Sequence, residues 1–274
     1  MVYPLEGVVS WNMNTRCNYR CTYCTQRFLD DRTRWARDLP AFIAAFGRLS
    51  GDWEVKLSGG EPFLHPSFDA LVEALVAQGR RVSVVTNLSA RDDALARFAE
   101  ATAGRPGLLS ASLHLEYTVV GPFREKLERL AGRYAGRICV TCVATRANLP
   151  RLAGLRAALA PFVFKVQPEK VDRVPLDYTL EERDQLVALG GHNGTGLIDP
   201  DLSGRPCWAG SRYFVVDDRG AAWRCYPARR ARTESLGSFL DPAFRLGLDA
   251  TPCRYSYCNC TVPQERGMVQ TRLT

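Results

Sequence analysis

The chain has 274 residues, of which 46% are hydrophobic and 24% charged, a balance typical of a folded domain and not of a disordered chain. Its net charge is +7, but 32 of the 36 basic residues are arginines scattered along the sequence, which does not favour a nucleic-acid partner. No apolar run reaches the length of about 18 residues that a membrane span needs, and no signal peptide is present, so we expect a cytoplasmic protein without a membrane partner.

Short apolar runs alternate with helical patterns through the first two thirds of the chain. We expect strands over residues 8–11, 53–57, 81–86, 108–115, 138–144 and 162–167. We expect helices over residues 39–49, 68–76, 90–101, 122–130, 149–159 and 180–189. Six strand–helix repeats predict an α/β fold with a parallel sheet and right-handed crossovers. Both an open doubly wound sheet and a partial barrel satisfy this periodicity.

The pattern changes after this alternation. Residues 191–206 are rich in glycine and proline and predict a linker between a domain at 1–190 and a C-terminal part at 207–274. In that part, two apolar runs flank an Asp- and Gly-containing turn at 217–220, which predicts a β-hairpin over 212–225. We expect these last residues to form a small separate module with little helix.

Ten cysteines are the most informative feature of the composition. Without a secretory signal they do not predict a disulfide framework. Cys139 and Cys142 lie in a strand pattern, where their spacing places them on opposite faces as packing residues. The other eight form two groups near the ends of the chain, which favours metal binding.

The first group, Cys17, Cys21 and Cys24, follows the first strand with the spacing Cys-x3-Cys-x2-Cys. Three thiolates so close fit three corners of one 4Fe–4S cluster and leave the fourth iron open, whereas a closed zinc site needs a fourth ligand nearby. A second motif follows the second strand and contains two glycines, which let a ligand approach the backbone, and an acidic residue that can bind an ammonium group. This motif consists of Gly59, Gly60, Glu61 and Pro62.

The two motifs together resemble those of the radical S-adenosylmethionine (SAM) superfamily. The resemblance covers residues 5–190 and implies a partial (β/α)6 TIM-like barrel. It implies that the open iron chelates the amino and carboxylate groups of SAM, that residues 59–62 contact the amine, and that Tyr23 lies near the adenine. It also implies that one electron from the cluster cleaves SAM to methionine and a 5′-deoxyadenosyl radical.

Later strands carry polar residues at alternating positions, as expected of a barrel with a polar interior. By the same resemblance, SAM's ribose or carboxylate is held by residues at the ends of the middle strands, namely Thr86, Asn87, Ser112 and, as a further candidate, Gln167. Oxidation of a substrate also requires a group that accepts a proton. We consider His114 and Lys165 for this role, and Arg146 as a group that orients the substrate.

The second group comprises Cys207, Cys225, Cys253, Cys258 and Cys260. The Gly-x4-Cys pattern that ends at Cys225 resembles the beginning of the SPASM/twitch extension of radical SAM enzymes, which implies an auxiliary 4Fe–4S cluster. The last three cysteines depart from that pattern. Five thiols are too few for two fully Cys-ligated clusters, so we expect one auxiliary cluster, with one of the last three as a spare; a structural zinc site is the alternative.

These features predict a radical SAM oxidoreductase that removes a hydrogen atom from an unactivated C–H bond. The auxiliary cluster either accepts the remaining electron or positions the substrate. Because the first strand begins near the N-terminus and leaves no room for a leader-binding domain, we expect a small polar metabolite, as in natural product biosynthesis, with flavodoxin or ferredoxin as reductant. A ribosomal peptide substrate, a non-oxidative radical reaction and a cluster-binding protein without turnover are the alternatives.

Overall fold

The computed structural model of the chain describes residues 7–26, 28–29, 32–171, 174–189, 201–256, 258 and 262–269. Within these ranges no helix is long and apolar enough to cross a membrane.

The strands in chain order are β1 (Gly7–Asn14), β2 (Trp53–Gly59), β3 (Arg81–Thr86), β4 (Pro106–Leu113), β5 (Arg137–Ala144), β6 (Val163–Pro168), β7 (Lys170–Val171), β8 (Val174–Pro175), β9 (Pro206–Cys207), β10 (Tyr213–Val216), β11 (Ala221–Trp223), β12 (Ser235–Ser238) and β13 (Thr251–Pro252). The helices are α1 (Arg32–Gly47), α2 (Phe68–Ala77), α3 (Asp92–Ala101), α4 (Val120–Ala131), α5 (Leu152–Ala158), α6 (Leu180–Ala188), α7 (Tyr226–Ala231) and α8 (Val262–Glu265), with short 3-10 turns η1 (Pro62–Leu64) and η2 (Leu149–Arg151). The expected strand–helix alternation from residue 8 to residue 189 is confirmed.

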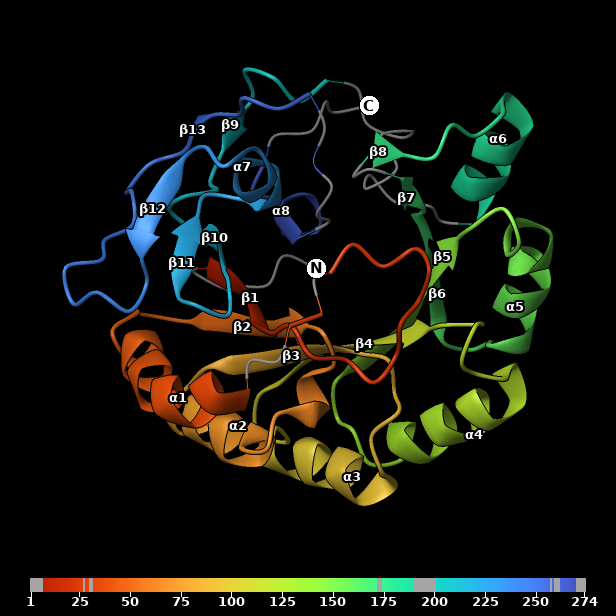
Figure 1. Cartoon of the computed structure of the whole chain (residues 1–274), viewed down its shortest axis with the longest axis horizontal. Helices are drawn as coiled ribbons and strands as arrows, with labels where there is room; N and C mark the ends of the chain where they lie inside the picture. Colours follow the sequence, from red (N-terminus) through yellow and green to blue (C-terminus); the bar gives the residue numbers. More distant parts are fainter. Residues whose placement is uncertain are drawn as a thin grey trace.

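Nine of the described strands form one sheet, in the order β12-β11-β10-β1-β2-β3-β4-β5-β6. Every pairing from β1 to β6 is parallel. Figure 1 shows the strands as an arc with α1 to α5 on its outer side. The predicted α/β fold with a parallel-dominated sheet is therefore confirmed, and the curvature is consistent with a partial TIM-like barrel.

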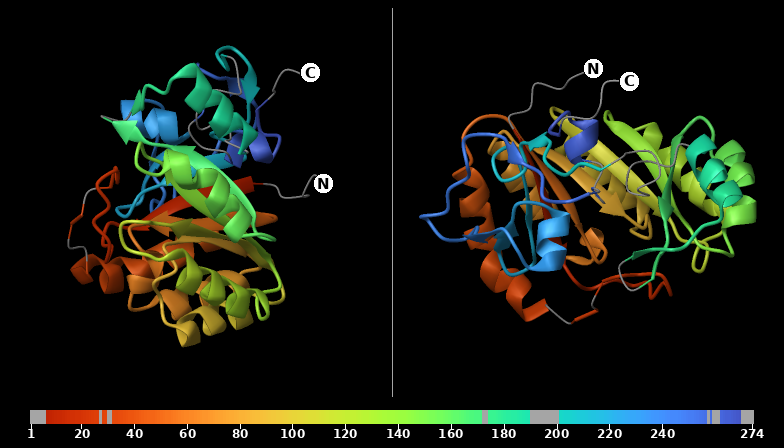
Figure 2. Two further views of the ribbon diagram at one scale, coloured as in Figure 1. Left: turned by 90° about the vertical axis from the view of Figure 1, so that its right-hand side faces the viewer. Right: turned by 90° about the horizontal axis from the view of Figure 1, so that it is seen from above.

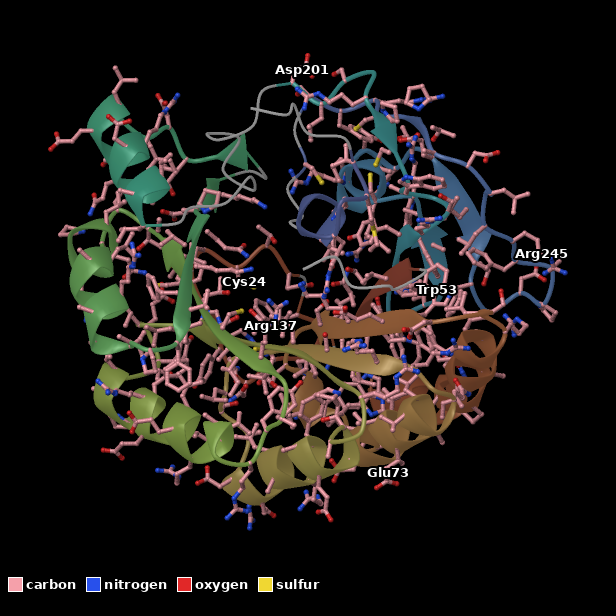
Figure 3. All side chains as sticks on the ribbon, turned by 180° about the vertical axis from the view of Figure 1, so that it is seen from behind. Cys24, Trp53, Glu73, Arg137, Asp201 and Arg245 are labelled. Carbon is pink, nitrogen blue, oxygen red and sulfur yellow. The ribbon has the colours of Figure 1, made fainter. Side chains whose placement is uncertain are left out.

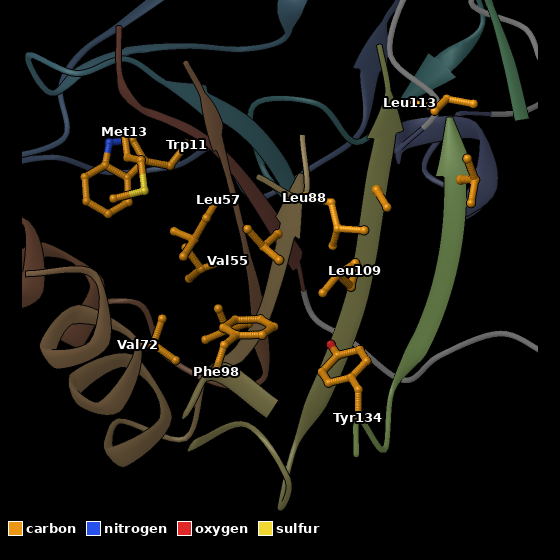
Figure 4. Close-up of a cluster of buried hydrophobic side chains, with 14 of the residues drawn as sticks. Trp11, Met13, Val55, Leu57, Val72, Leu88, Phe98, Leu109, Leu113 and Tyr134 are labelled. Carbon is orange, nitrogen blue, oxygen red and sulfur yellow. The ribbon is translucent and has the colours of Figure 1, made fainter. Parts of the chain in front are cut away.

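The main apolar core lies between the convex face of the sheet and these helices. Figure 4 shows its side chains, which come from alternate positions of successive strands and from the helices that cover them. On β4, Leu109, Ala111 and Leu113 are buried in this core. Ser110 and Ser112 alternate with them and therefore lie on the concave face. The alternation predicted for this strand thus leaves a polar inner face.

The C-terminal residues differ from the expected separate module. The predicted hairpin is present, with β10 and β11 antiparallel, but β10 also pairs in parallel with β1 and so continues the barrel sheet. The reason is that β1 is buried along its whole length, and β10 satisfies the backbone groups that its edge would otherwise expose. The boundaries expected at residues 190 and 206 stay predictions, because residues 190–200 lie outside the described ranges.

Two short helices of this C-terminal part, α7 and α8, lie on the concave side of the sheet, opposite α1 to α5 (Figures 1 and 2). They cover a second apolar cluster that includes Val8 of β1 and Val215 of β10. Cys207 and Cys225 belong to the same cluster. Cys207 and Cys225 therefore face the inside of the arc, where the polar face of the barrel strands also lies.

Candidate functional site

The first cysteine group lies in the segment that follows β1, at the carboxyl edge of the parallel strands. This segment, residues 17–24, is called the cysteine loop below. Cys21 is buried, Cys17 is half-buried and Cys24 is exposed. The backbone N–H of Cys24 donates to the carbonyl of Cys21 at 3.0 Å, a turn that keeps these two residues close. Figure 3 shows Cys24 on the concave side of the sheet, while Glu73 lies on the outer helical layer.

Gly59 and Gly60 allow two chain segments to pack at backbone distance. A Cβ on Gly60 would lie 1.9 Å from the carbonyl oxygen of Arg16, and one on Gly59, whose φ is +127°, would lie 2.3 Å from that of Asn14. The Gly60 N–H donates to the Asn14 carbonyl at 2.9 Å. The close approach predicted for a ligand is thus made in this structure by the chain leading into the cysteine loop.

Glu61, in the same motif, is buried and makes several hydrogen bonds to neighbouring segments. Its backbone N–H donates to Arg16, and its carboxylate caps η1 by accepting from Phe63 N–H at 3.2 Å, with Pro62 as the first residue of the turn. Burial raises the pKa of the Glu61 carboxyl to about 7, against the lowering effect of its hydrogen bonds. The carboxylate is 1% exposed, and contact with an ammonium group stays a prediction.

Thr86 and Asn87, at the end of β3, join Glu61 to the cysteine loop. The Thr86 hydroxyl and the Asn87 backbone N–H donate to the two Glu61 oxygens at 2.8 and 2.7 Å. The Asn87 side-chain amide donates to Asn18 at 2.9 Å and lies 3.7 Å from the sulfur of Cys17. The positions expected to hold SAM therefore also fix the loop, and their contacts with SAM stay predictions.

His114, expected as a proton acceptor, contacts the cysteine loop. Its Nδ1 lies 2.9 Å from the Tyr23 hydroxyl and 3.3 Å from the sulfur of Cys21. Burial lowers the pKa of His114, raises that of the Cys21 thiol to about 11 and raises that of Tyr23. Tyr23 stacks on the imidazole with ring centroids 6.0 Å apart. The structure thus gives both residues partners within the chain, and contact of Tyr23 with adenine stays a prediction.

Lys165 lies on the inner face of the sheet in one row with two hydroxyl residues. In the strand register Ser112 is opposite Thr141, and Thr141 is opposite Lys165. Gln167 follows one step along β6 on the same face and is half-buried. The structure therefore brings together Ser112, Lys165 and Gln167 as polar groups on the concave face.

Arg146 binds residues in and just before α6, and not the polar row of Ser112, Thr141 and Lys165. Its guanidinium donates to Glu182 and to the carbonyl of Asp177, and it lies 5.7 Å from the ring centre of Tyr178. The hydrogen bond from Arg146 is also the main cause of the lowered pKa of Glu182. These contacts make Arg146 a link between the end of β5 and α6, and its role in orienting substrate stays a prediction.

The second cysteine group is brought together by three separate elements. Cys207 ends β9, which pairs with β13 just before Cys253, and Cys225 is the N-cap residue of α7. Cys253 and Cys258 pack against the apolar cluster that contains Cys207 and Cys225. Burial raises the pKa of the Cys225 thiol to about 12, with smaller contributions in the same direction from Cys207 and Cys253. Cys260 lies outside the described residues.

Arg224 is a buried residue of this region that no sequence motif assigned to the site. Its guanidinium pairs with Glu234 at 2.9 Å and donates to the carbonyls of Cys207 and Thr251, at 3.3 and 2.9 Å. The arginine therefore ties β9 and β13 to the segment between β11 and α7 that carries Cys225. The only sequence signal was its position beside Cys225, in a chain where arginines are common.

The chemistry of the two cysteine groups bears on which metal group they could hold. None of the described cysteines forms a disulfide bond, and no three His, Cys, Asp or Glu side chains in the described ranges converge closely enough to hold one metal ion. A zinc ion requires sulfur ligands about 2.3 Å from a single point. A 4Fe–4S cluster instead takes each thiolate on a different iron. Three thiols within one loop suit three corners of such a cluster, and for the second group the zinc alternative stays open.

Comparison with known proteins points to one family. Residues 11–129 match the family model of the Radical SAM superfamily. A probable GTP 3′,8-cyclase from Methanocella arvoryzae is 36% identical over 88 residues, which are 31% of this chain and 28% of the relative. A probable GTP 3′,8-cyclase from Pyrobaculum aerophilum is 32% identical over 79 residues, 27% of this chain and 25% of the relative. The chain thus spans little more than a quarter of the length of these relatives.

Solved structures share the fold over most of the chain. Streptococcus suis SuiB bound to precursor peptide SuiA has a TM-score of 0.57 at 12% identity, covering 89% of this chain and 64% of that one. Native anSMEcpe with bound AdoMet and Cp18Cys peptide has a TM-score of 0.55 at 15% identity, covering 86% of this chain and 77% of that one. At such identities these matches establish the fold alone.

Proposed function

We propose that the protein is an enzyme that uses SAM to remove a hydrogen atom from an unactivated C–H bond, since residues 11–129 match the family model of the Radical SAM superfamily. The substrate radical then loses one more electron and one proton, which completes a two-electron oxidation such as that of an alcohol to a ketone. The proposed substrate is a small polar metabolite, and the reductant is flavodoxin or ferredoxin.

The observation that carries this proposal is the position of the cysteine loop. The loop is held by the carboxyl ends of β2, β3 and β4, and it carries three cysteines at the carboxyl edge of a parallel sheet. Ligands of open α/β sheets and of barrels bind at this edge. Within the described residues, the concave face below the loop carries hydroxyl, amide and ammonium groups.

Cys17, Cys21 and Cys24 are the residues that would hold the SAM-binding 4Fe–4S cluster. When bound, such a cluster supplies the electron that cleaves SAM to methionine and a 5′-deoxyadenosyl radical. The chain's own contribution is to fix the loop through Asn87 and Glu61 and to leave Cys24 exposed. Gly59 to Pro62, Tyr23, Ser112 and Gln167 are the proposed SAM contacts.

Lys165 is the proposed proton acceptor. It lies in the polar row with Ser112 and Thr141 on the concave face of the sheet. His114 is the weaker candidate for this role, because its Nδ1 is engaged by Tyr23 and Cys21. A side chain that accepts a proton must reach the substrate atom directly or through one water molecule.

The C-terminal cysteines are the proposed ligands of an auxiliary 4Fe–4S cluster. Cys207, Cys225, Cys253 and Cys258 share one apolar cluster on the concave side of the sheet. This placement supports a SPASM/twitch-like role, in which the group accepts the second electron of the substrate or positions the substrate. Cys260 remains the candidate for the spare thiol.

A ribosomal peptide is the second candidate substrate. The observation in its favour is that two solved structures with this fold, SuiB and anSMEcpe, contain bound peptides. Both substrate classes share the same first step, the removal of a hydrogen atom. They differ in the surface that must recognise the rest of the substrate.

The test is an anaerobic assay of the reconstituted protein with SAM and dithionite. We expect 5′-deoxyadenosine to form, and we expect none from a Cys24→Ala variant, which lacks one anchoring thiolate. Panels of deuterated aminocyclitols, sugars and peptides then identify the substrate by deuterium transfer into 5′-deoxyadenosine. Equal 5′-deoxyadenosine formation by the variant would refute the proposed function.

A further inference from the structure

The loop between β4 and α4 contacts consecutive residues of the cysteine loop. We propose that residues 114–118 are a platform that sets the conformation of the cysteine loop, and that His114 is its positioning residue, which donates from Nδ1 to the sulfur of Cys21. This inference rests on the proposed function, because it concerns the cluster that Cys21 would help to hold. In this inference His114 influences the reduction potential of that cluster and does not serve as the proton acceptor for the substrate.

The platform makes a series of polar contacts with residues 20–22. The Arg20 N–H donates to the Tyr117 hydroxyl at 2.9 Å. The Thr22 N–H and hydroxyl donate to the Glu116 carboxylate at 3.0 and 2.5 Å. These three hydrogen bonds connect one loop directly with the other.

Aromatic contacts reinforce this series. Tyr19 stacks on Tyr117 with ring centroids 4.5 Å apart, and its hydroxyl lies 3.2 Å from that of Thr118. The platform is itself closed by a turn, since the N–H groups of Tyr117 and Thr118 both donate to the His114 carbonyl at 2.9 Å. The backbone at His114 is therefore fixed, and its imidazole is directed at the loop.

The chemistry of the sulfur decides the direction of the hydrogen bonds. A thiolate bound to iron carries no proton, so the Cys21 sulfur can only accept. The groups that face it are the Nδ1 of His114 at 3.3 Å and Tyr23, whose hydroxyl lies 2.9 Å from the same nitrogen. The neutral imidazole with its proton on Nδ1 is the tautomer that satisfies this arrangement.

Hydrogen bonds to cluster sulfurs are among the factors that set the reduction potential of an iron–sulfur cluster. A donor stabilises the more negative, reduced state, so its loss lowers the potential. Cys21 is also buried, which leaves few water molecules to replace a lost donor. The platform thus favours reduction of the cluster, the event on which SAM cleavage depends.

The experiment compares two substitutions in anaerobically reconstituted protein. His114→Phe keeps a ring but removes the donor, whereas His114→Asn retains an N–H near the position of Nδ1. We expect His114→Phe to reduce the ratio of reduced to oxidised cluster about tenfold at a fixed potential, a downward shift of about 59 mV for one electron. We expect His114→Asn to restore most of this shift. The potential is followed by the EPR signal that Cys24→Ala lacks.

His65→Phe is the matched control, because His65 is also buried but stacks on Trp35 and accepts from Ser67 N–H. We expect the control to leave the potential unchanged. A wild-type potential in His114→Phe would overturn the inference, as would equal loss of iron from both His114 variants. Absence of the cluster or of SAM cleavage in the wild-type protein would instead refute the proposed function itself.

Discussion

The carboxylate of Glu61 accepts a hydrogen bond from the backbone N–H of Asn87 at 2.7 Å, which joins the ends of β2 and β3 under the cysteine loop. Asn87 continues this connection through its side chain to Asn18. Three donors of the chain, from Phe63, Thr86 and Asn87, bind this buried carboxylate, so it has a structural role. The motif that resembles a SAM-binding element is thus also the element that positions the cysteines.

Glu61 predicts a pH dependence of folding stability. Its pKa is about 7 in the folded chain and lies near its ordinary value of 4.5 when unfolded, so the folded chain holds the proton more tightly between these values. The free energy of unfolding should therefore fall as pH rises from 4.5 to 7 and then level off. The total decrease caused by Glu61 should be about 3 kcal/mol. Urea unfolding at several pH values measures this decrease, and it should be absent in the Glu61→Gln variant.

The control for this experiment is Glu73→Gln, which removes a carboxylate from the exposed face of α2 (Figure 3). It should keep the wild-type difference between unfolding free energies at pH 5 and pH 7.5. An equal pH profile for Glu61→Gln and wild type would mean that Glu61 is ionised in the folded chain at both pH values.

Gly60→Ala should displace the cysteine loop. The new methyl group would meet the Arg16 carbonyl at 1.9 Å, an overlap with backbone that a rotamer change cannot relieve. We expect a loss of about 1–3 kcal/mol in unfolding free energy and a reduced iron content after reconstitution. Gly121→Ala in α4 is the matched control, since its Cβ would meet no atom within 4 Å. Iron binding by Gly60→Ala at the wild-type level would contradict the assigned packing role.

The two separated cysteine groups predict two clusters. Anaerobically reconstituted protein should contain about eight iron and eight sulfide per chain, from two 4Fe–4S sites. The triple variant Cys17/Cys21/Cys24→Ala should retain about half of each, measured by iron and sulfide analysis. A triple variant without iron, or with zinc in its place, would refute the auxiliary cluster.

Cys225→Ala should separate the two roles of the C-terminal group. Cys225 is buried in the cluster with Cys207, so its loss should lower solubility as well as activity. If the group accepts an electron, the folded variant should still transfer deuterium from substrate to 5′-deoxyadenosine while product is lost. If the group positions substrate, deuterium transfer should fall together with product. Product at the wild-type level from a variant without the second cluster would exclude both roles.

The order of the barrel strands was predictable because it depends on local patterns. Apolar alternation in β4 fixes which side chains face the helices, and short strand–helix repeats restrict the sheet to parallel pairing with neighbours in sequence. The spacing of Cys17, Cys21 and Cys24 likewise acts within one loop. Such features depend on residues close in the chain, and their geometry follows from backbone periodicity.

The pairing of β10 with β1 was not predictable in the same way. Tyr213 and Val8 are separated by most of the chain, and nothing in a hairpin pattern specifies which outer edge it will join. The same holds for Arg224, whose partners come from β9 and β13. A long-range pairing forms where it covers an exposed strand edge and buries apolar area. A local sequence pattern contains no information on which distant segment will do so.

The parallel α/β fold, the cysteine spacings and the Gly-Gly-Glu-Pro motif could be read from the amino-acid sequence, because each is a property of neighbouring residues. The partners of individual side chains required the three-dimensional structure: His114 lies with Cys21, Glu61 with Asn87, and Gly60 with Arg16. The physical reason is that a side chain's chemistry depends on burial and on donors supplied by distant segments. The alternating strand pattern around His114 therefore suggested a proton acceptor, whereas the fold places that imidazole beside a cysteine sulfur.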